Sequence, residues 1–124
     1  MSELNIINLT AMEREIIDRY HEAFQRYGFP SSENIKVDKR VNTGAGRYTY
    51  FCPSCKISMA DGQVGLGTYS QINMDGLEAG ASFWIYVENG ALQYLEIVVN
   101  GNQPWDGEER KWTICDPETG NFSS

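Results

Sequence analysis

The chain has 124 residues, of which 41% are hydrophobic and 22% are charged. This length and composition are typical of one globular domain with its own hydrophobic core, so we expect a single domain over residues 1–124. No apolar run reaches the roughly 20 residues that a membrane-spanning helix needs, and the first residues, MSELNIINL, lack the basic start of a signal peptide. The sequence therefore argues against a membrane protein and predicts a cytoplasmic location.

The net charge of −7 is unevenly distributed along the chain. Residues 34–56 hold five Lys or Arg and a single acidic residue, whereas residues 57–109 hold eight Asp or Glu and no Lys or Arg. An acidic surface of this kind repels nucleic acid and attracts a basic protein partner. The alternative is that the acidic residues serve solubility alone.

The N-terminal part of the chain predicts one helix over residues 11–27. Thr10 and Glu13 have the spacing of a capping box, in which each side chain satisfies a backbone N–H of the other residue. Gly28 and Pro30 end the helical pattern. The helix is amphipathic and must bury its apolar stripe against another element. That stripe is Met12, Ile16, Tyr20, Phe24 and Tyr27.

The rest of the chain predicts strands, because apolar and polar residues alternate with a period of two. The predicted fold class is α+β, with one N-terminal helix packed on a curved, mainly antiparallel sheet of about five to six strands. Before the last strand, the loop NGNQPWDG at residues 100–107 is expected to expose Trp105. The expected strands cover residues 34–42, 47–52, 64–73, 81–88, 91–99 and 110–115.

The segment ASFWIYVENGALQYLEIVV predicts a β-hairpin, because Asn89-Gly90 is the strongest short turn signal between two strand-forming runs. A two-residue turn pairs Val87 with Leu92 and, with regular alternation, Phe83 with Glu96. That register predicts Glu96 on an otherwise apolar face. The opposite face is also mostly apolar and holds Trp84, Tyr86, Gln93, Leu95 and Ile97. Since only one helix is available, either the sheet curls on itself or one face is free for a partner.

The stretch YFCPSCK contains a CxxC motif, and three cysteines in all is an odd number typical of a reducing compartment. A closed zinc site would need His21, Cys52, Cys55 and Cys115 together, from three distant elements. A thioredoxin-like site would need a helix after the motif, where KISMADGQVG has no helical period. We favour a turn with small buried thiols and expect no metal and no cofactor. A zinc or thiol protein is the alternative.

Residues for catalysis are sparse. His21 is the only histidine, and the GxSxG, P-loop and HExxH patterns are missing. An apolar environment can turn a carboxyl such as that of Glu96 into a proton donor of raised pKa, but no second carboxylate or base accompanies it in the pattern. We therefore expect no enzymatic activity. A small-ligand binding module is an alternative, with a cavity between the helix and the curled sheet around Tyr94 and Glu96.

Short motifs between residues 41 and 105 resemble those of a group of small uncharacterised bacterial α+β proteins. The group shares TGxG, GAxF, a dGxLxxLE hairpin and a PW pair. The corresponding segments here are TGAG at 43–46, GASF at 80–83, NGALQYLE at 89–96 and Pro104-Trp105.

Size, acidity, a single α+β domain and few catalytic residues are also similar to immunity proteins of bacterial toxin systems, including those of contact-dependent growth inhibition. The resemblance implies an inhibitor that covers a basic toxin, often a nuclease, with aromatic anchors at the centre and carboxylates at the rim. The expected anchors are Trp84, Tyr86 and Trp105, and the expected charge partners are Glu88, Asp106, Glu108 and Glu109. A homodimer through the spare apolar face is left open.

Overall fold

A computed structural model describes residues 7–53, 56–66, 71–115 and 122–123. The helical elements are α1 (Ala11–Ala23) and two short 3-10 helices, η1 (Gln25–Tyr27) and η2 (Ser32–Asn34). The strands are β1 (Val37–Asn42), β2 (Gly46–Phe51), β3 (Gly62–Val64), β4 (Gln71–Met74), β5 (Leu77–Glu88), β6 (Ala91–Val99), β7 (Trp112–Cys115) and β8 (Phe122–Ser123). None of the helices in the described part of the chain has the length and apolar character needed to cross a membrane.

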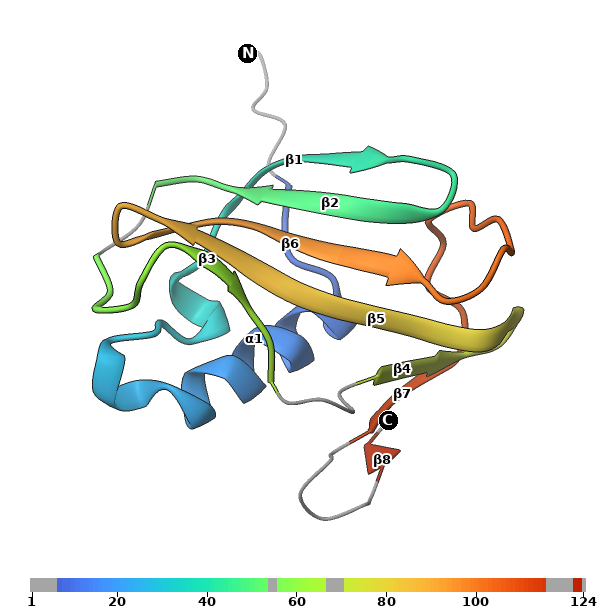
Figure 1. Cartoon of the computed structure of the whole chain (residues 1–124), viewed down its shortest axis with the longest axis horizontal. Coiled ribbons are helices and arrows are strands. Elements are labelled where there is room, and N and C mark those ends of the chain that lie inside the picture. Colours follow the sequence, from blue (N-terminus) through green and yellow to red (C-terminus); the bar gives the residue numbers. More distant parts are fainter. Residues whose placement is uncertain (1–6, 54–55, 67–70, 116–121, 124) are drawn as a thin grey trace.

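The predicted α+β class is confirmed. All strand pairs are antiparallel, and the sheet order is β1-β2-β6-β5-β4-β7-β8, with β3 paired to β5 beside β4. The sheet has eight strands instead of five or six, because β3, β4 and β8 are short elements that the sequence pattern merged or missed. Figure 1 shows α1 beside the long central strands, which curve away towards β4, β7 and β8.

Helix α1 begins as predicted. The Thr10 hydroxyl accepts a hydrogen bond from the Glu13 backbone N–H at 3.1 Å, and the Glu13 carboxylate accepts one from the Thr10 N–H at 2.9 Å. The helix ends at Ala23, four residues before the predicted end, and the chain tightens into η1 before Gly28 turns with a φ of 83°. This tightening places Phe24 and Phe29 against Tyr20, which closes one end of the core.

The β5–β6 hairpin has the predicted turn but not the predicted register. Asn89 and Gly90 take positive φ angles of 54° and 74°, and Val87 pairs with Leu92 as expected. A β-bulge then adds one residue, Gln93, to β6, so Tyr86 pairs with Tyr94. Because side chains alternate along a strand, one extra residue exchanges the faces of everything after it in β6.

The predicted faces are therefore correct for β5 but wrong for the residues of β6 beyond the bulge. The face toward α1 is apolar, and all its side chains are buried. Glu96 and Tyr94 lie on the other face, half-buried, so the predicted cavity between the helix and these two residues is not formed. The buried face consists of Phe83, Ile85, Val87, Leu92, Leu95, Ile97 and Val99.

The predicted strand over residues 64–73 is interrupted. Strand β3 pairs with the end of β5, from Ile85 to Val87, and β4 pairs with its beginning, up to Ser82. Gly65 and Leu66 between them are not in a strand, and residues 67–70 lie outside the described part. Gly80 of β5 has a φ of 70°, and a Cβ there would lie 2.4 Å from the Ile72 carbonyl oxygen, so β4 approaches β5 at a point where only glycine fits.

Candidate functional site

The two faces of the sheet carry different chemistry. The face toward α1 holds the hydrophobic core and one ionic network. The opposite face is half-exposed and aromatic, and we call it the open face. It consists of six half-buried side chains, those of Tyr48, Tyr50, Trp84, Tyr86, Tyr94 and Glu96. The strand pairing that places them together was not visible in the sequence, because β2 and β6 are adjacent only in the sheet.

The residues of the open face form two rows across β2, β6 and β5. In one row Tyr48 pairs with Glu96, and Glu96 pairs with Trp84. In the next row Tyr50 pairs with Tyr94, and Tyr94 pairs with Tyr86. Directly opposed side chains in antiparallel strands are close enough to contact one another, so the rows form one continuous surface.

The tyrosine rings of the open face contact one another. Tyr94 is central, with the ring of Tyr86 stacked at 5.3 Å between centroids and an interplanar angle of 11°. Tyr48 and Tyr50 meet the same ring edge-on, at 5.3 Å and 5.6 Å. Such offset and edge-to-face contacts stabilise aromatic pairs beyond simple burial. These contacts hold the rings in defined orientations.

Among the described residues, the Glu96 carboxylate accepts a hydrogen bond from one donor, which is neutral. The Trp84 indole N–H donates to its Oε1 at 3.0 Å. An interaction of the Tyr48 hydroxyl with Glu96, together with partial burial and the negative charge, raises the pKa of Tyr48. Partial burial and the Glu96 charge likewise raise the pKa of Tyr94. A negative charge thus lies among aromatic rings, with no cation paired to it in the described residues.

The network on the helix side was missed by the sequence analysis, which assigned Glu13 only to the cap. Its side chain is 0% exposed and accepts hydrogen bonds from Arg40, Arg47 and Thr49. Burial raises the pKa of Glu13, but bonds from Arg40, the Thr10 backbone and Thr49 and the charge of Arg47 outweigh burial, so the pKa is lowered. The network ties α1 to β1 and β2 and is structural in character.

The segment between β6 and β7 packs on this network. Trp105 is 4% exposed, lies over the Arg47 guanidinium at 5.5 Å and donates its indole N–H to the Glu108 carbonyl at 2.9 Å. The predicted exposure of Trp105 is therefore wrong. Its burial follows from the cation and the core beneath it, which no local pattern in NGNQPWDG reveals. Glu109 is 13% exposed and accepts a hydrogen bond from Arg47 at 2.7 Å.

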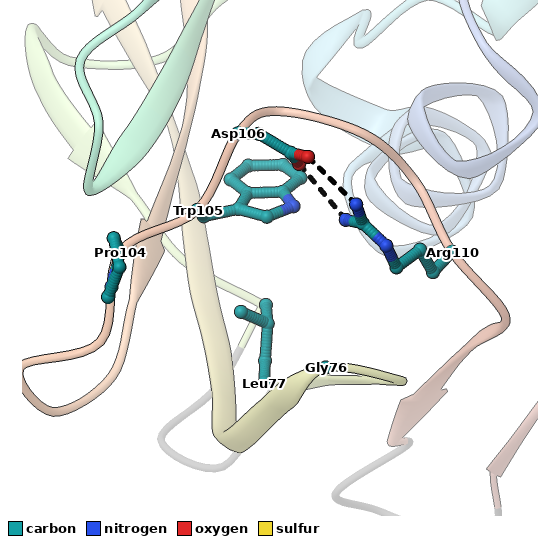
Figure 2. A pocket seen from close by; sticks show the side chains of 6 residues that line it. All are labelled: Gly76, Leu77, Pro104, Trp105, Asp106 and Arg110. Atoms are coloured by element: carbon teal, nitrogen blue, oxygen red, sulfur yellow. Dashed lines mark hydrogen bonds and ion pairs between the residues drawn. The ribbon is translucent and has the colours of Figure 1, made fainter.

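A shallow pocket of about 330 Å³ lies beside Trp105, lined by Gly76, Leu77, Pro104, Trp105, Asp106 and Arg110. Figure 2 shows the Asp106 carboxylate and the Arg110 guanidinium joined by two bonds at its rim. Asp106 and Glu108 are exposed. The hydrogen bonds and charge of Arg110 hold the pKa of Asp106 well below its usual range.

The seven residues predicted to bind a partner thus fall into two groups. Trp84 and Tyr86 lie on the open face, and Glu88 is exposed at the end of the same side of β5. The other four lie in the segment before β7, where Trp105 and Glu109 belong to the core network and Asp106 and Glu108 are exposed. Four residues that the sequence did not assign to partner binding lie on the open face with Trp84 and Tyr86. They are Tyr48, Tyr50, Tyr94 and Glu96. The alternation in GRYTYF indicates that Tyr48 and Tyr50 share a face.

The residues of the alternative zinc site are only partly described. Cys55 lies outside the described residues, and so does the side chain of Cys115. Cys52 is a half-buried free thiol, and His21 Nδ1 donates to the Phe29 carbonyl at 2.7 Å. In the part of the chain that the structure describes, no group of three or more His, Cys, Asp or Glu side chains is placed to hold a metal ion.

Comparison of the chain with protein-family models, with curated protein sequences and with solved structures gave no match. A function for this chain must therefore be inferred from the geometry of the open face.

Proposed function

We propose that this chain is a non-enzymatic, protein-binding inhibitor, an immunity protein that neutralises a bacterial toxin in the cytoplasm by covering it with the open face. The observation that carries the proposal is the aromatic side of the sheet opposite α1, with five aromatic side chains that remain half-exposed. Soluble proteins seldom leave a continuous aromatic surface of this kind without a use in binding.

The side chains of the open face suit a protein partner. Tyr and Trp are the residues most enriched among those that dominate binding energy, because each combines a large apolar surface with a hydrogen-bonding group. Contacts between the rings of Tyr48, Tyr86 and Tyr94 limit their motion. A side chain that is already ordered loses less conformational entropy on binding.

The charge distribution favours a basic partner. The hairpin at the centre of the open face contributes Glu88 and Glu96. It contributes no Lys or Arg, because none occurs within residues 57–109. Lys39, on the same side of β1, is the neighbouring cation, and it lies over the Tyr50 ring. Complementary charge accelerates encounter with a basic protein and excludes like-charged partners. A toxin that binds nucleic acid has a basic surface of the required kind.

The test is co-expression with the protein encoded immediately upstream of this gene. We expect that protein alone to stop growth and the wild-type chain to restore it. The double variant Trp84→Ala, Tyr86→Ala should lose protection while its circular dichroism spectrum stays native. Glu108→Lys, an exposed change away from the open face, is the control and should still protect.

Two results would contradict the proposal. If the wild-type chain fails to restore growth, it is not the inhibitor of that toxin. If the double variant is folded and protects as well as wild type, the open face is not the binding surface. A Glu88→Lys variant adds a kinetic readout, because charge reversal at the rim should slow association, and the difference should shrink as salt is added.

A further inference from the structure

Glu96 is the one acidic side chain within the two rows of the open face. Its strand neighbours are Tyr48 on β2 and Trp84 on β5, and the second row of tyrosines lies alongside. A carboxylate has two oxygens and can accept about four hydrogen bonds. The described donor is the Trp84 indole. Acceptor capacity is therefore left over, and this neutral donor does not neutralise the negative charge.

Glu13 is a carboxylate whose charge is compensated within the chain. Two guanidiniums, those of Arg40 and Arg47, bond to it directly, at 2.5 Å and 2.8 Å. Glu96 has the same kind of charge in a half-buried aromatic setting and lacks such a cation among the described residues. The difference indicates that the counter-charge of Glu96 comes from outside the chain.

The rings around Glu96 are suited to a cation. The negative faces of aromatic rings attract ammonium and guanidinium groups within about 6 Å of the ring centroid. The chain already uses this interaction at the edge of the same surface, where Lys39 Nζ lies 5.1 Å from the centroid of Tyr50. Tyr50 contacts both Tyr48 and Tyr94, so the ring that receives Lys39 is continuous with the rings next to Glu96.

We propose that the open face is a receptor for one cationic side chain, an arginine or lysine of the partner protein, which bonds to the Glu96 carboxylate and lies against the rings of Tyr48 and Tyr94. The inference rests on the proposed function and names the chemical group that the partner presents. Trp84 acts as a positioning residue, because its hydrogen bond orients the carboxylate. The surrounding rings lower the local polarity, which strengthens the ion pair.

The experiment titrates the full isotope-labelled chain with three capped tripeptides at low salt, followed by nuclear magnetic resonance. The peptides are Gly-Arg-Gly, Gly-Lys-Gly and Gly-citrulline-Gly, in which citrulline is a neutral analogue of arginine. The reporter is the Trp84 indole N–H, which bonds directly to Glu96 and is assigned by its loss in Trp84→Phe. Charge-assisted bonds are roughly twice as strong as neutral ones, so we expect the citrulline peptide to bind on the order of tenfold more weakly than the arginine peptide.

The matched variants are Glu96→Gln and Glu88→Gln, which remove the same charge from the same side of the hairpin. Glu96→Gln should weaken binding of the arginine and lysine peptides on the order of tenfold, and Glu88→Gln by about twofold or less. Equal effects of the two variants would show only general attraction to an acidic surface and would overturn the proposal. So would equal binding of the citrulline and arginine peptides.

The peptide titration and the growth assay test the cation site and the inhibitor role independently. If the peptides bind as expected but no toxin is neutralised, the cation site stands and the proposed inhibitor role fails. If protection depends on Trp84 and Tyr86 while citrulline and arginine peptides bind alike, the inhibitor role stands and the cation receptor fails. Sedimentation of the free chain tests the remaining occupant, because a stable dimer that is lost in Trp84→Ala would assign the face to a second copy and overturn the proposal.

Discussion

The two faces of the sheet place a glutamate in opposite situations. Glu13, on the helix side, is fully buried and bonded to two arginines. Glu96, on the open face, is half-buried, bonded to a tryptophan and paired across the sheet with a tyrosine. A buried charge must be compensated inside the molecule, since desolvation is costly, whereas a half-buried charge is partly compensated by solvent. Glu13 therefore holds the fold together, whereas Glu96 is the group that our proposal assigns to recognition.

The same contrast applies to two tryptophans, and the largest expected effect tests it. Trp105→Ala should lower the free energy of unfolding by about 4 kcal/mol, because a ring that is 4% exposed leaves a cavity over Arg47. Trp84→Ala, on the open face, should cost about 1 kcal/mol, since its ring is only half-buried. Urea denaturation followed by circular dichroism measures both. Equal losses would mean that the open face is part of the core.

The second prediction concerns the buried carboxylate. Glu13→Gln should lower the free energy of unfolding by about 3 kcal/mol, at the low end for a broken buried pair, because Glu109 still faces Arg47. Glu15→Gln on the same helix is the matched control, where loss of the surface pair with Arg19 should cost about 0.5 kcal/mol or less. Urea denaturation at neutral pH measures both losses of unfolding free energy. Similar losses for the two variants would show that the network does not stabilise the fold.

The third prediction follows from the lowered pKa of Glu13. Burial raises the pKa of this carboxyl, but its bonds to Arg40, Thr10 and Thr49 and the charge of Arg47 hold it below the usual 4.5. Ionised Glu13 therefore stabilises the fold above about pH 4.5, and that stabilisation is lost as the pH falls through the lower native pKa.

In Glu13→Gln, the free energy of unfolding should accordingly fall less between neutral and acidic pH than it does in wild type. Glu15→Gln provides the reference curve. An acid side as steep in Glu13→Gln as in wild type would contradict the assignment.

The smallest expected effect is on the open face itself. Glu96→Gln should change the free energy of unfolding by about 1 kcal/mol or less, because one hydrogen-bonded acceptor replaces another. It should lower the pKa of Tyr48, which the interaction with Glu96 and its charge raise, and to a lesser degree that of Tyr94. Ultraviolet titration of the phenolates checks this, with Glu88→Gln as control. Unchanged tyrosine titration would show that Glu96 does not contact Tyr48 in solution.

Local features of the fold were predictable because neighbouring residues alone decide them. Thr10 and Glu13 form their capping box within one turn of helix, and Asn89-Gly90 adopt the positive φ angles that a two-residue turn requires. Strand β6 has its predicted bounds, and β5 ends at Glu88 as predicted but begins at Leu77, four residues earlier than predicted. The candidate site on the open face was only partly predictable. The sequence named Trp84 and Tyr86 for a partner and Tyr94 and Glu96 for a ligand, but it did not name the tyrosines of β2.

The fold class, the start of α1, the central hairpin and the uneven charge follow from the order of the residues alone. Which residues share a face depends on how the strands pair. The single extra residue at Gln93 exchanges the faces of Leu95 and Glu96, and neither side-chain period nor propensity announces a bulge. Trp105 is buried, and Glu13 is paired, because of Arg47 from β2, a residue distant in sequence from both. Contacts of that kind exist only after the sheet has formed, and they separate the core of this protein from its open face.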